Sequence, residues 1–241
     1  MKFALQPGLS SREVIAIMNS ARRMRHDYEI WPGRPDPAEQ LCPIGSVEYC
    51  ESYWSPETRQ EWSHYAIDFY PDFLKEWLHR RVGYAGFGFS PVNLRSDSTV
   101  SKSIFLKPAK SWKGEFVSRV VGLDEFVPID WYYWSDPVSF VQEWRYYVAN
   151  GRVITTGWYA GNDEDEPAPT LWDVKWPSTY SAAVDFGRLD DGRIALVEAH
   201  APFACGWYGE NHDDYVRWQA EAWINYTYKP DIFIRKDLGR F

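Results

Sequence analysis

The stretch AAVDFGRLDDGRIALVEAH, residues 182–200, contains two apolar runs on either side of a turn. Ala182–Phe186 and Ile194–Glu198 have the length and composition of buried β-strands. The sequence DDGR between them, residues 190–193, is typical of a hairpin turn. We therefore predict that the two strands are antiparallel neighbours.

This hairpin brings two carboxylates together. Asp185 and Glu198 each stand at the end of an apolar run. Two adjacent carboxylates repel unless a cation lies between them, and carboxylate oxygens are usual ligands of Mg²⁺. We predict a metal site at Asp185 and Glu198, with His200 on the same strand face as a ligand or proton carrier. The alternative is structural: one capping Asp, one hydrogen-bonded Glu and one packed His.

More strand-like runs precede this hairpin. They are Ser103–Leu106, Glu115–Val121, Asp130–Trp134, Glu143–Val148 and Arg152–Trp158. The sequence ANGR, residues 149–152, predicts a second hairpin turn between the last two. The second half of the chain therefore predicts antiparallel sheets.

A lysine ends the first of these runs. Lys107 follows the apolar residues 104–106, and Pro108 stops the strand ladder. A lysine there is costly to bury unless an anion meets it. Lys113 follows in a short loop, so the segment can fold over phosphates with two lysines as point charges. The alternative is a hairpin with surface lysines.

A charged pair, Glu143 and Arg145, shares one face of the predicted strand 143–148. We interpret Arg145 as a contact to phosphates or to a transferred phosphoryl group, with Glu143 orienting its guanidinium. The alternative is a cross-strand salt bridge on a solvated face.

The first hundred residues predict a smaller α/β portion. Phe3–Gln6 is predicted as a strand, and residues 11–26 as an amphipathic helix that begins at a Ser10/Glu13 capping box. The remaining expectations are a strand within 41–49, a helix over 56–80 broken at Pro71, a loop over 83–103 and a closing helix over 214–225. We place a domain boundary in that loop, giving domains of residues 1–100 and 101–241.

Composition limits the class of protein. The 241 residues carry a net charge of −8, which argues against a nucleic-acid partner. Cys42, Cys50 and Cys205 have no metal-type spacing and argue against a disulfide framework. No apolar run approaches the roughly 20 residues of a membrane helix, and no signal-peptide pattern is present. We expect no membrane partner and a cytoplasmic protein.

In their order and spacing, these motifs resemble the ATP-grasp fold, and within it the R2K-type branch of phages and bacteria. Residues 105–114 resemble the family's strand lysine and phosphate-covering loop, and residues 143–145 resemble its acidic-x-Arg strand. Asp185 and residues 198–200 resemble its magnesium ligands Asp and Glu-x-Asn, with His200 in place of Asn. The resemblance covers about residues 100–210. It implies an α/β protein whose antiparallel sheets clamp a nucleotide.

The resemblance also implies a reaction. It indicates an enzyme that binds ATP and Mg²⁺ and joins a carboxylate substrate to an amine acceptor through an acyl phosphate. Lys107, Lys113, Glu143 and Arg145 would then contact the nucleotide, with Lys113 and Arg145 also catalytic and Asp136 on the ribose. The rival functions are a metal-dependent phosphohydrolase or phosphotransferase, and a non-catalytic nucleotide-binding accessory protein.

Overall fold

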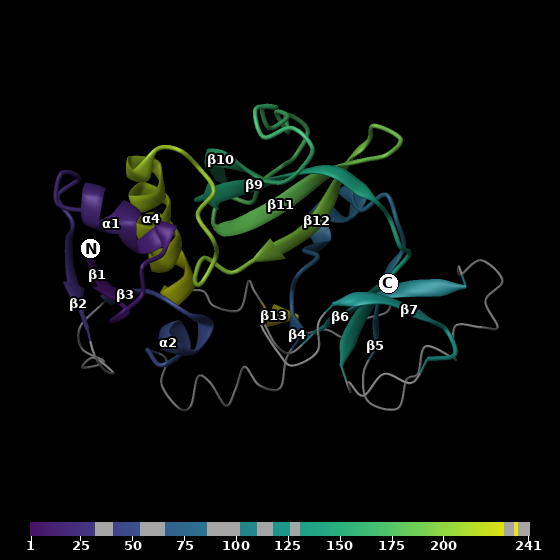
Figure 1. Ribbon diagram of the computed structural model, residues 1–241, viewed down its shortest axis with the longest axis horizontal. Coiled ribbons are helices and arrows are strands. Elements are labelled where there is room, and N and C mark those ends of the chain that lie inside the picture. The colour runs from purple at the N-terminus through teal and green to yellow at the C-terminus, as the bar shows by residue number, and fades with distance from the viewer. Residues whose placement is uncertain are drawn as a thin grey trace.

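A parallel sheet forms one end of the computed structural model, which describes residues 1–31, 41–53, 66–85, 102–109, 118–125, 131–228 and 234–235. Its strands are β1 (Lys2–Leu5), β2 (Asp27–Ile30) and β3 (Leu41–Ile44), in the order β2-β1-β3. Helix α1 (Arg12–Ser20) connects β1 to β2. Helix α4 (His212–Tyr228) packs beside α1, so a late segment of the chain completes the N-terminal part (Figure 1).

Two N-terminal elements differ from the prediction. Helix α1 ends at Ser20 instead of residue 26, and its N-cap is Ser11, whose hydroxyl accepts the N–H of Val14 at 3.4 Å. Strand β3 ends at Ile44, and helix α2 (Val47–Glu51) follows it. The hydroxyl of Ser46 starts this helix by accepting the N–H of Tyr49 at 3.2 Å, a capping signal that the apolar run concealed.

The long-strand sheet is antiparallel and has the order β10-β9-β11-β12. Its strands are β9 (Phe140–Ala149), β10 (Arg152–Gly161), β11 (Ala182–Leu189) and β12 (Ile194–His200). Both predicted hairpins are confirmed. At the first turn Asn150 and Gly151 have φ angles of 51° and 66°, which suit a type I′ turn.

The short-strand sheet has the order β5-β8-β6-β7. Its strands are β5 (Val82–Ala85), β6 (Ser103–Pro108), β7 (Arg119–Gly122) and β8 (Tyr132–Ser135). Strand β5 falls in the predicted loop over 83–103, and Gly83 is the reason: a glycine suggests a loop. Here the glycine is required for packing, because a Cβ at Gly83 would lie 2.3 Å from the indole of Trp134. The mixed α/β architecture with antiparallel sheets confirms the predicted fold class.

The segment between the N-terminal sheet and β5 also differs from the prediction. Within the described part of the predicted helix over 56–80, β4 (Ala66–Ile67) pairs with β13 (Ile234–Arg235), and a 3-10 helix, η1, spans Asp72–Trp77. Pro71 caps η1 and keeps an extended backbone, with a ψ of 139°, so no longer helix passes through it. Since β5 pairs with β8 across residue 100, the division into residues 1–100 and 101–241 stays a proposal.

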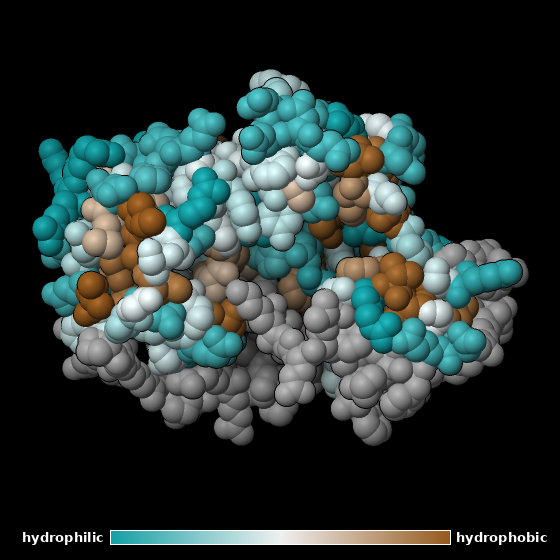
Figure 2. Space-filling view, viewed as in Figure 1, coloured by the Kyte–Doolittle hydropathy of each residue, from teal (hydrophilic) through white to brown (hydrophobic). Residues whose placement is uncertain are grey.

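Most of the aromatic side chains serve the core. Trp144, Trp207 and Trp218 are buried, whereas Trp172 is 87% exposed. Figure 2 shows a mostly hydrophilic face with separate, small apolar patches.

The three cysteines are buried and free, and burial raises the pKa of the Cys50 and Cys205 thiols to about 12. Among the described residues, no helix combines the length and apolar character needed to cross a membrane.

Candidate nucleotide and metal site

Four residues form one row across the long-strand sheet. The strand registers pair Gly157 with Arg145, Arg145 with Asp185, and Asp185 with Glu198. Directly paired residues point to the same face of a sheet, so the three side chains line one surface. Gly157 leaves room for the loop after β12: a Cβ there would lie 2.4 Å from the carbonyl carbon of Tyr208.

Arg145 is held by Asp185. Its Nε and Nη2 donate to the two carboxylate oxygens of Asp185, each at 2.7 Å, and the two side chains are only 6% and 1% exposed. The guanidinium lies over the rings of Tyr159 and Tyr208, at 4.9 and 5.2 Å from their centroids. Burial works against its charge, but the Asp185 carboxylate outweighs burial and raises the pKa of Arg145 well above its ordinary value.

The predicted role of Glu143 as the orienting group for Arg145 is therefore wrong. Asp185 takes that role because it lies directly opposite Arg145 on the neighbouring strand, whereas Glu143 lies opposite Gly187. Within the described part of the chain, no hydrogen bond or ion pair engages the half-buried Glu143 carboxylate. Burial, with the negative charges of Asp185 and Glu198, raises the pKa of Glu143 to about 7, against the opposing effect of Arg145.

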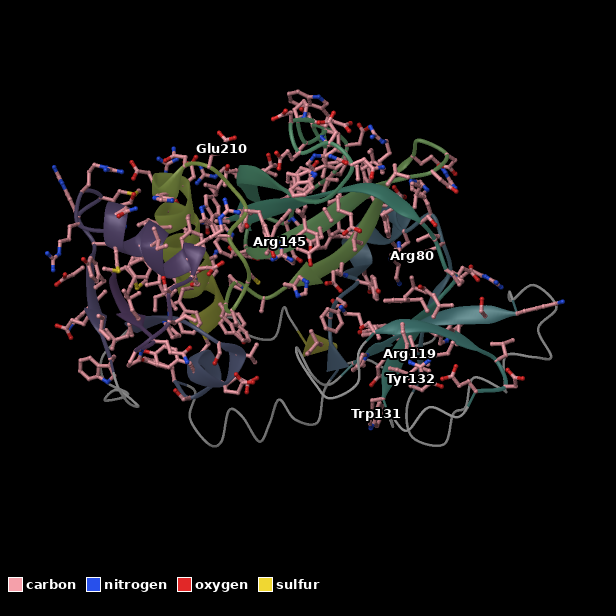
Figure 3. All side chains as sticks on the ribbon, in the orientation of Figure 1. Arg80, Arg119, Trp131, Tyr132, Arg145 and Glu210 are labelled. Atoms are coloured by element: carbon pink, nitrogen blue, oxygen red, sulfur yellow. The ribbon has the colours of Figure 1, made fainter. Side chains whose placement is uncertain are left out.

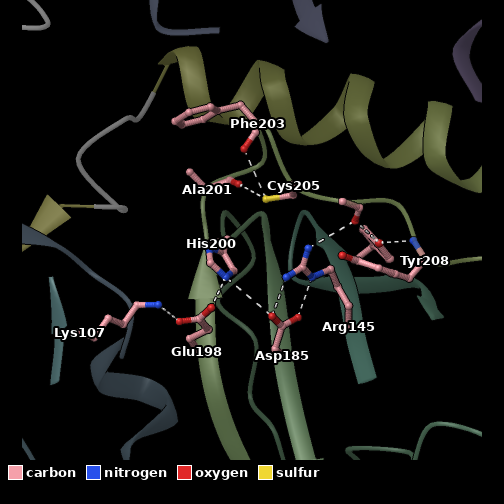
Figure 4. A network of polar contacts seen from close by, with 11 residues as sticks. Lys107, Arg145, Asp185, Glu198, His200, Ala201, Phe203, Cys205 and Tyr208 are labelled. Carbon is pink, nitrogen blue, oxygen red and sulfur yellow. Dashed lines mark hydrogen bonds and ion pairs between the residues drawn. The ribbon is translucent and has the colours of Figure 1, made fainter. Parts of the chain in front are cut away.

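At the other end of the row, Glu198 joins two sheets (Figure 4). Its Oε2 accepts a hydrogen bond from Nζ of Lys107 on β6, and its Oε1 lies 2.6 Å from Nε2 of His200. Lys107 also lies over the ring of Phe69, 4.1 Å from its centroid. Burial opposes ionisation of Glu198, but the charges and hydrogen bonds of His200 and Lys107 prevail, so the pKa of Glu198 lies far below its ordinary value.

Asp185, Glu198 and His200 come together as the sequence predicts. Each offers a ligand atom, and these atoms lie within 4.8 Å of one another. Nε2 of His200 is 3.7 Å from Oδ2 of Asp185. Each carboxylate oxygen has a second lone pair beyond the hydrogen bond it accepts, so this donor set fits a hard divalent cation. His200 adds a nitrogen donor, which Mn²⁺ and later transition metals accept more readily than Mg²⁺.

The other predicted site residues have different positions. Asp136 follows β8 and is held by Arg81, whose Nε and Nη2 donate to it at 2.8 and 2.7 Å. These hydrogen bonds from Arg81 lower the pKa of Asp136, against the effect of burial. Lys113 lies outside the described residues.

Arg80 is a structural residue that sequence reasoning missed. Its Nη1 donates to the carbonyl oxygen of Leu196 at 2.6 Å, and its Nη2 donates to that of Val197 at 3.1 Å. It therefore fastens the segment before β5 to strand β12, between the long-strand sheet and the short-strand sheet (Figure 3). No local signal in the sequence indicated the two carbonyl partners of Arg80.

A cavity of about 470 Å³ opens beside the row. One wall comes from the residues that follow β1 and β3, including Leu9, Ser11, Glu13 and the segment 43–47. The facing walls come from Arg145, Glu198 and His200 and from the loop that follows β12, including Phe203, Cys205, Gly206 and Tyr208. Ligands of α/β proteins bind at the carboxyl ends of parallel strands, and this placement was the signal that could have indicated the N-terminal wall.

Two sets of hydrogen bonds fix the loop after β12. Tyr147 Oη donates to the carbonyl oxygen of Gly206 at 2.6 Å and accepts the N–H of Tyr208 at 2.9 Å. The backbone N–H of Trp207 donates to Oε1 of Glu13, which joins this loop to helix α1. The cavity therefore has a wall that is anchored to both the long-strand sheet and the N-terminal part.

Comparison with known proteins gives one family match. Residues 78–218 match the ATP-grasp domain, R2K clade family 2. No curated protein matches the chain.

Solved structures share the fold at low sequence identity. D-cycloserine synthetase DcsG aligns with a TM-score of 0.57 and 11% identity, over 92% of this chain and 100% of that one. D-alanine–D-alanine ligase from Bacillus anthracis, complexed with ATP, aligns at 0.52 and 12% identity, over 95% and 99% of the two chains. The ATP-grasp ligase PsnB, complexed with a phosphomimetic variant of its minimal precursor, Mg and ADP, aligns at 0.52 and 10% identity, over 91% and 97%.

Proposed function

Since the chain belongs to R2K clade family 2 of the ATP-grasp proteins, we propose that it is an ATP- and Mg²⁺-dependent ligase that joins a carboxylate to an amine. The observation that carries this proposal is a continuous series of charged side chains, called the charged row from here on. Arg145 pairs with Asp185, Asp185 lies opposite Glu198, and Glu198 pairs with Lys107. The charged row connects the face of the long-strand sheet with the short-strand sheet, and these are the two surfaces between which a nucleotide would be clamped.

The residues of the row divide the task of handling phosphate charge. Asp185, Glu198 and His200 would hold the metal, which would supply positive charge to neutralise the phosphates. Lys107, with Lys113 from the covering loop, would contact the phosphates as point charges. Lys107 is paired with Glu198, so a cation held by Glu198 would compete with Lys107 and make its ammonium available to a phosphate. Binding of the metal to Glu198 would therefore favour the contact between Lys107 and the nucleotide.

The reaction we propose has two balanced steps. A substrate carboxylate oxygen bonds to the γ-phosphorus of ATP, and ADP leaves, giving an acyl phosphate. The amine nitrogen then bonds to the acyl carbon, phosphate leaves, and the nitrogen loses a proton. Arg145, fixed by Asp185 and two tyrosine rings, would stabilise the transferring charge without rearrangement, which is how preorganised donors act.

We also propose a compartment and partners for this protein. Three free thiols suit a reducing compartment, and we place the enzyme in the cytoplasm. Its partners would be ATP, a carboxylate substrate and an amine acceptor.

The test is ADP release from the full chain with ATP and Mg²⁺, over a matrix of carboxylates and amines. We expect slow turnover with either class alone and faster turnover with a matched pair, with the amide identified by mass spectrometry. An acyl phosphate must be shielded from water, so the site should assemble only when it is occupied. Brisk hydrolysis that is indifferent to every acceptor would favour a phosphohydrolase. ATP binding without any turnover would favour an accessory protein.

A further inference from the structure

The cavity beside the charged row has the size of a small-molecule site. Its volume of about 470 Å³ lies in the lower part of the roughly 300–1,000 Å³ range of ligand pockets. The rings of Tyr159, Phe203, Tyr208 and Tyr215 contribute to its lining, so its middle is suited to the carbon skeleton of a ligand. Its occupant is therefore a compact molecule instead of a folded protein segment.

The charges of this cavity do not balance. Its acidic and basic side chains are Glu13, Arg145, Glu198 and His200. Arg145 is neutralised by Asp185, and Glu198 is neutralised by Lys107 with a hydrogen bond to His200. Glu13 accepts only the neutral N–H of Trp207, and no cation contacts it within the described part of the chain. A half-buried carboxylate without a countercharge favours a ligand that brings one.

We propose that this cavity binds the carboxylate substrate, that this substrate is an amino acid, and that Glu13 holds its ammonium group. This assignment rests on the proposed ligase function and specifies its substrate class. An ammonium paired with a carboxylate has no free lone pair, so it is recognised and not consumed. The ligand's carboxylate then extends along the cavity toward Arg145 and His200, where the phosphoryl transfer takes place.

A purely structural role for Glu13 predicts something different. Glu13 lies in the first turn of α1, where a carboxylate complements the helix dipole, and it anchors the loop at Trp207. Both contributions affect stability, but neither distinguishes a ligand with an ammonium group from one without. Glu13→Gln separates the two roles, because the amide oxygen still accepts the Trp207 N–H while the negative charge is lost.

The primary test is binding, read by ligand-observed NMR on the full chain with ADP and Mg²⁺. The probes are glycine, both enantiomers of alanine and of glutamate, and the desamino analogues acetate, propionate and glutarate. We expect the wild-type chain to bind at least one amino acid about 10- to 100-fold more tightly than its desamino analogue. Glu13→Gln should abolish that preference. The control Glu210→Gln removes an exposed carboxylate on the same loop, outside the cavity lining, and should retain it (Figure 3).

A second readout separates this inference from the ligase proposal. Hydroxylamine, a small neutral nucleophile, traps acyl phosphates as hydroxamates without an amine acceptor. Hydroxamate from amino acids, with KM raised about 10- to 100-fold in Glu13→Gln and little change in kcat, supports both proposals. Hydroxamate from desamino acids at equal efficiency in both proteins overturns the Glu13 site and leaves the ligase. No hydroxamate, with ammonium-dependent binding intact, overturns the ligase and leaves the site. Wild-type binding without an ammonium preference overturns the site.

Discussion

The two ion pairs of the charged row, Arg145–Asp185 and Lys107–Glu198, differ in their burial and in the sheets they join. Arg145 and Asp185 belong to neighbouring strands of one sheet, form two hydrogen bonds and are almost completely buried. Lys107 and Glu198 come from different sheets and are 13% and 18% exposed. The first pair is fixed by the register of a single sheet. The second pair spans two sheets, so its contact can open when a cation or phosphate competes for either partner. We expect the first pair to govern stability and the second to govern ligand binding.

The largest effect should come from breaking the buried Arg145–Asp185 pair. Asp185→Asn leaves the buried guanidinium of Arg145 without its countercharge, and we expect a loss of about 3–5 kcal/mol in the free energy of unfolding. Urea denaturation followed by tryptophan fluorescence measures it. Asp191→Asn is the matched control, because it removes the acidic partner of an exposed arginine in the same hairpin and should leave the denaturation midpoint unchanged. Equal midpoint shifts in the two variants would show that the Arg145–Asp185 pair is not special.

Breaking the Lys107–Glu198 pair should change ligand affinity more than stability. If Lys107 contacts a phosphate, Lys107→Ala removes one charge-assisted hydrogen bond, and we expect ATP affinity measured with Mg²⁺ by calorimetry to fall by about 1.5–3 kcal/mol. If Glu198 holds the metal, the same variant without nucleotide should bind Mn²⁺ more tightly, because Lys107 no longer competes for Glu198. Lys2→Ala, at the start of β1 in the N-terminal sheet, is the control for a lost positive charge. A parallel loss of metal and nucleotide affinity in Lys107→Ala would contradict the competition between lysine and cation.

Glu143 tests the electrostatic cost of placing a further carboxylate near Asp185 and Glu198. Its pKa rises from 4.5 to about 7, so the folded state binds more protons than the unfolded state in that interval. Stability that is complete below about pH 4.5 is therefore lost as pH rises toward 7. After a discount for the partial exposure of this side chain, we expect Glu143→Gln to stabilise the metal-free protein by about 1–2 kcal/mol above pH 7.

The same variant should have no effect on stability near pH 4. Urea midpoints measured between pH 4 and 8 with EDTA present give both limits. Glu164→Gln, at an exposed position in the loop after β10, controls for the loss of a negative charge. A gain in stability that does not depend on pH would contradict a raised pKa for Glu143.

The sequence predicted those parts of the site that local patterns determine. Alternation and turn residues placed Asp185 opposite Glu198, because both lie in one hairpin. The partner of Arg145 was not predictable in this way. Strands β9 and β11 are neighbours in the sheet but are separated in the chain by β10 and the loop after it, so their register has no local signal.

The cavity depends on still more distant pairs. Glu13 accepts the backbone N–H of Trp207 across 194 positions of sequence, where α4 packs against α1. Strand β5 was missed because a local signal was misleading. A glycine at position 83 suggests a loop, whereas in the fold it allows close packing against Trp134. The sequence therefore predicted the fold class and the proximity of Asp185, Glu198 and His200, but not the N-terminal wall of the cavity.

The smallest effect concerns Asp136, which we propose as the ribose contact although Arg81 already engages its carboxylate. If Asp136 also accepts a ribose hydroxyl, the wild-type chain should prefer ATP over 2′-deoxy-ATP by about 0.5–1.5 kcal/mol, the net value of one hydrogen bond. Asp136→Asn should reduce this preference while leaving the affinity for inorganic triphosphate unchanged, because we expect the phosphates to contact Lys107 at the other end of the nucleotide. Calorimetry with the three ligands measures both quantities. A sugar preference that survives in Asp136→Asn would limit Asp136 to its salt bridge with Arg81 and leave the ribose contact to another residue.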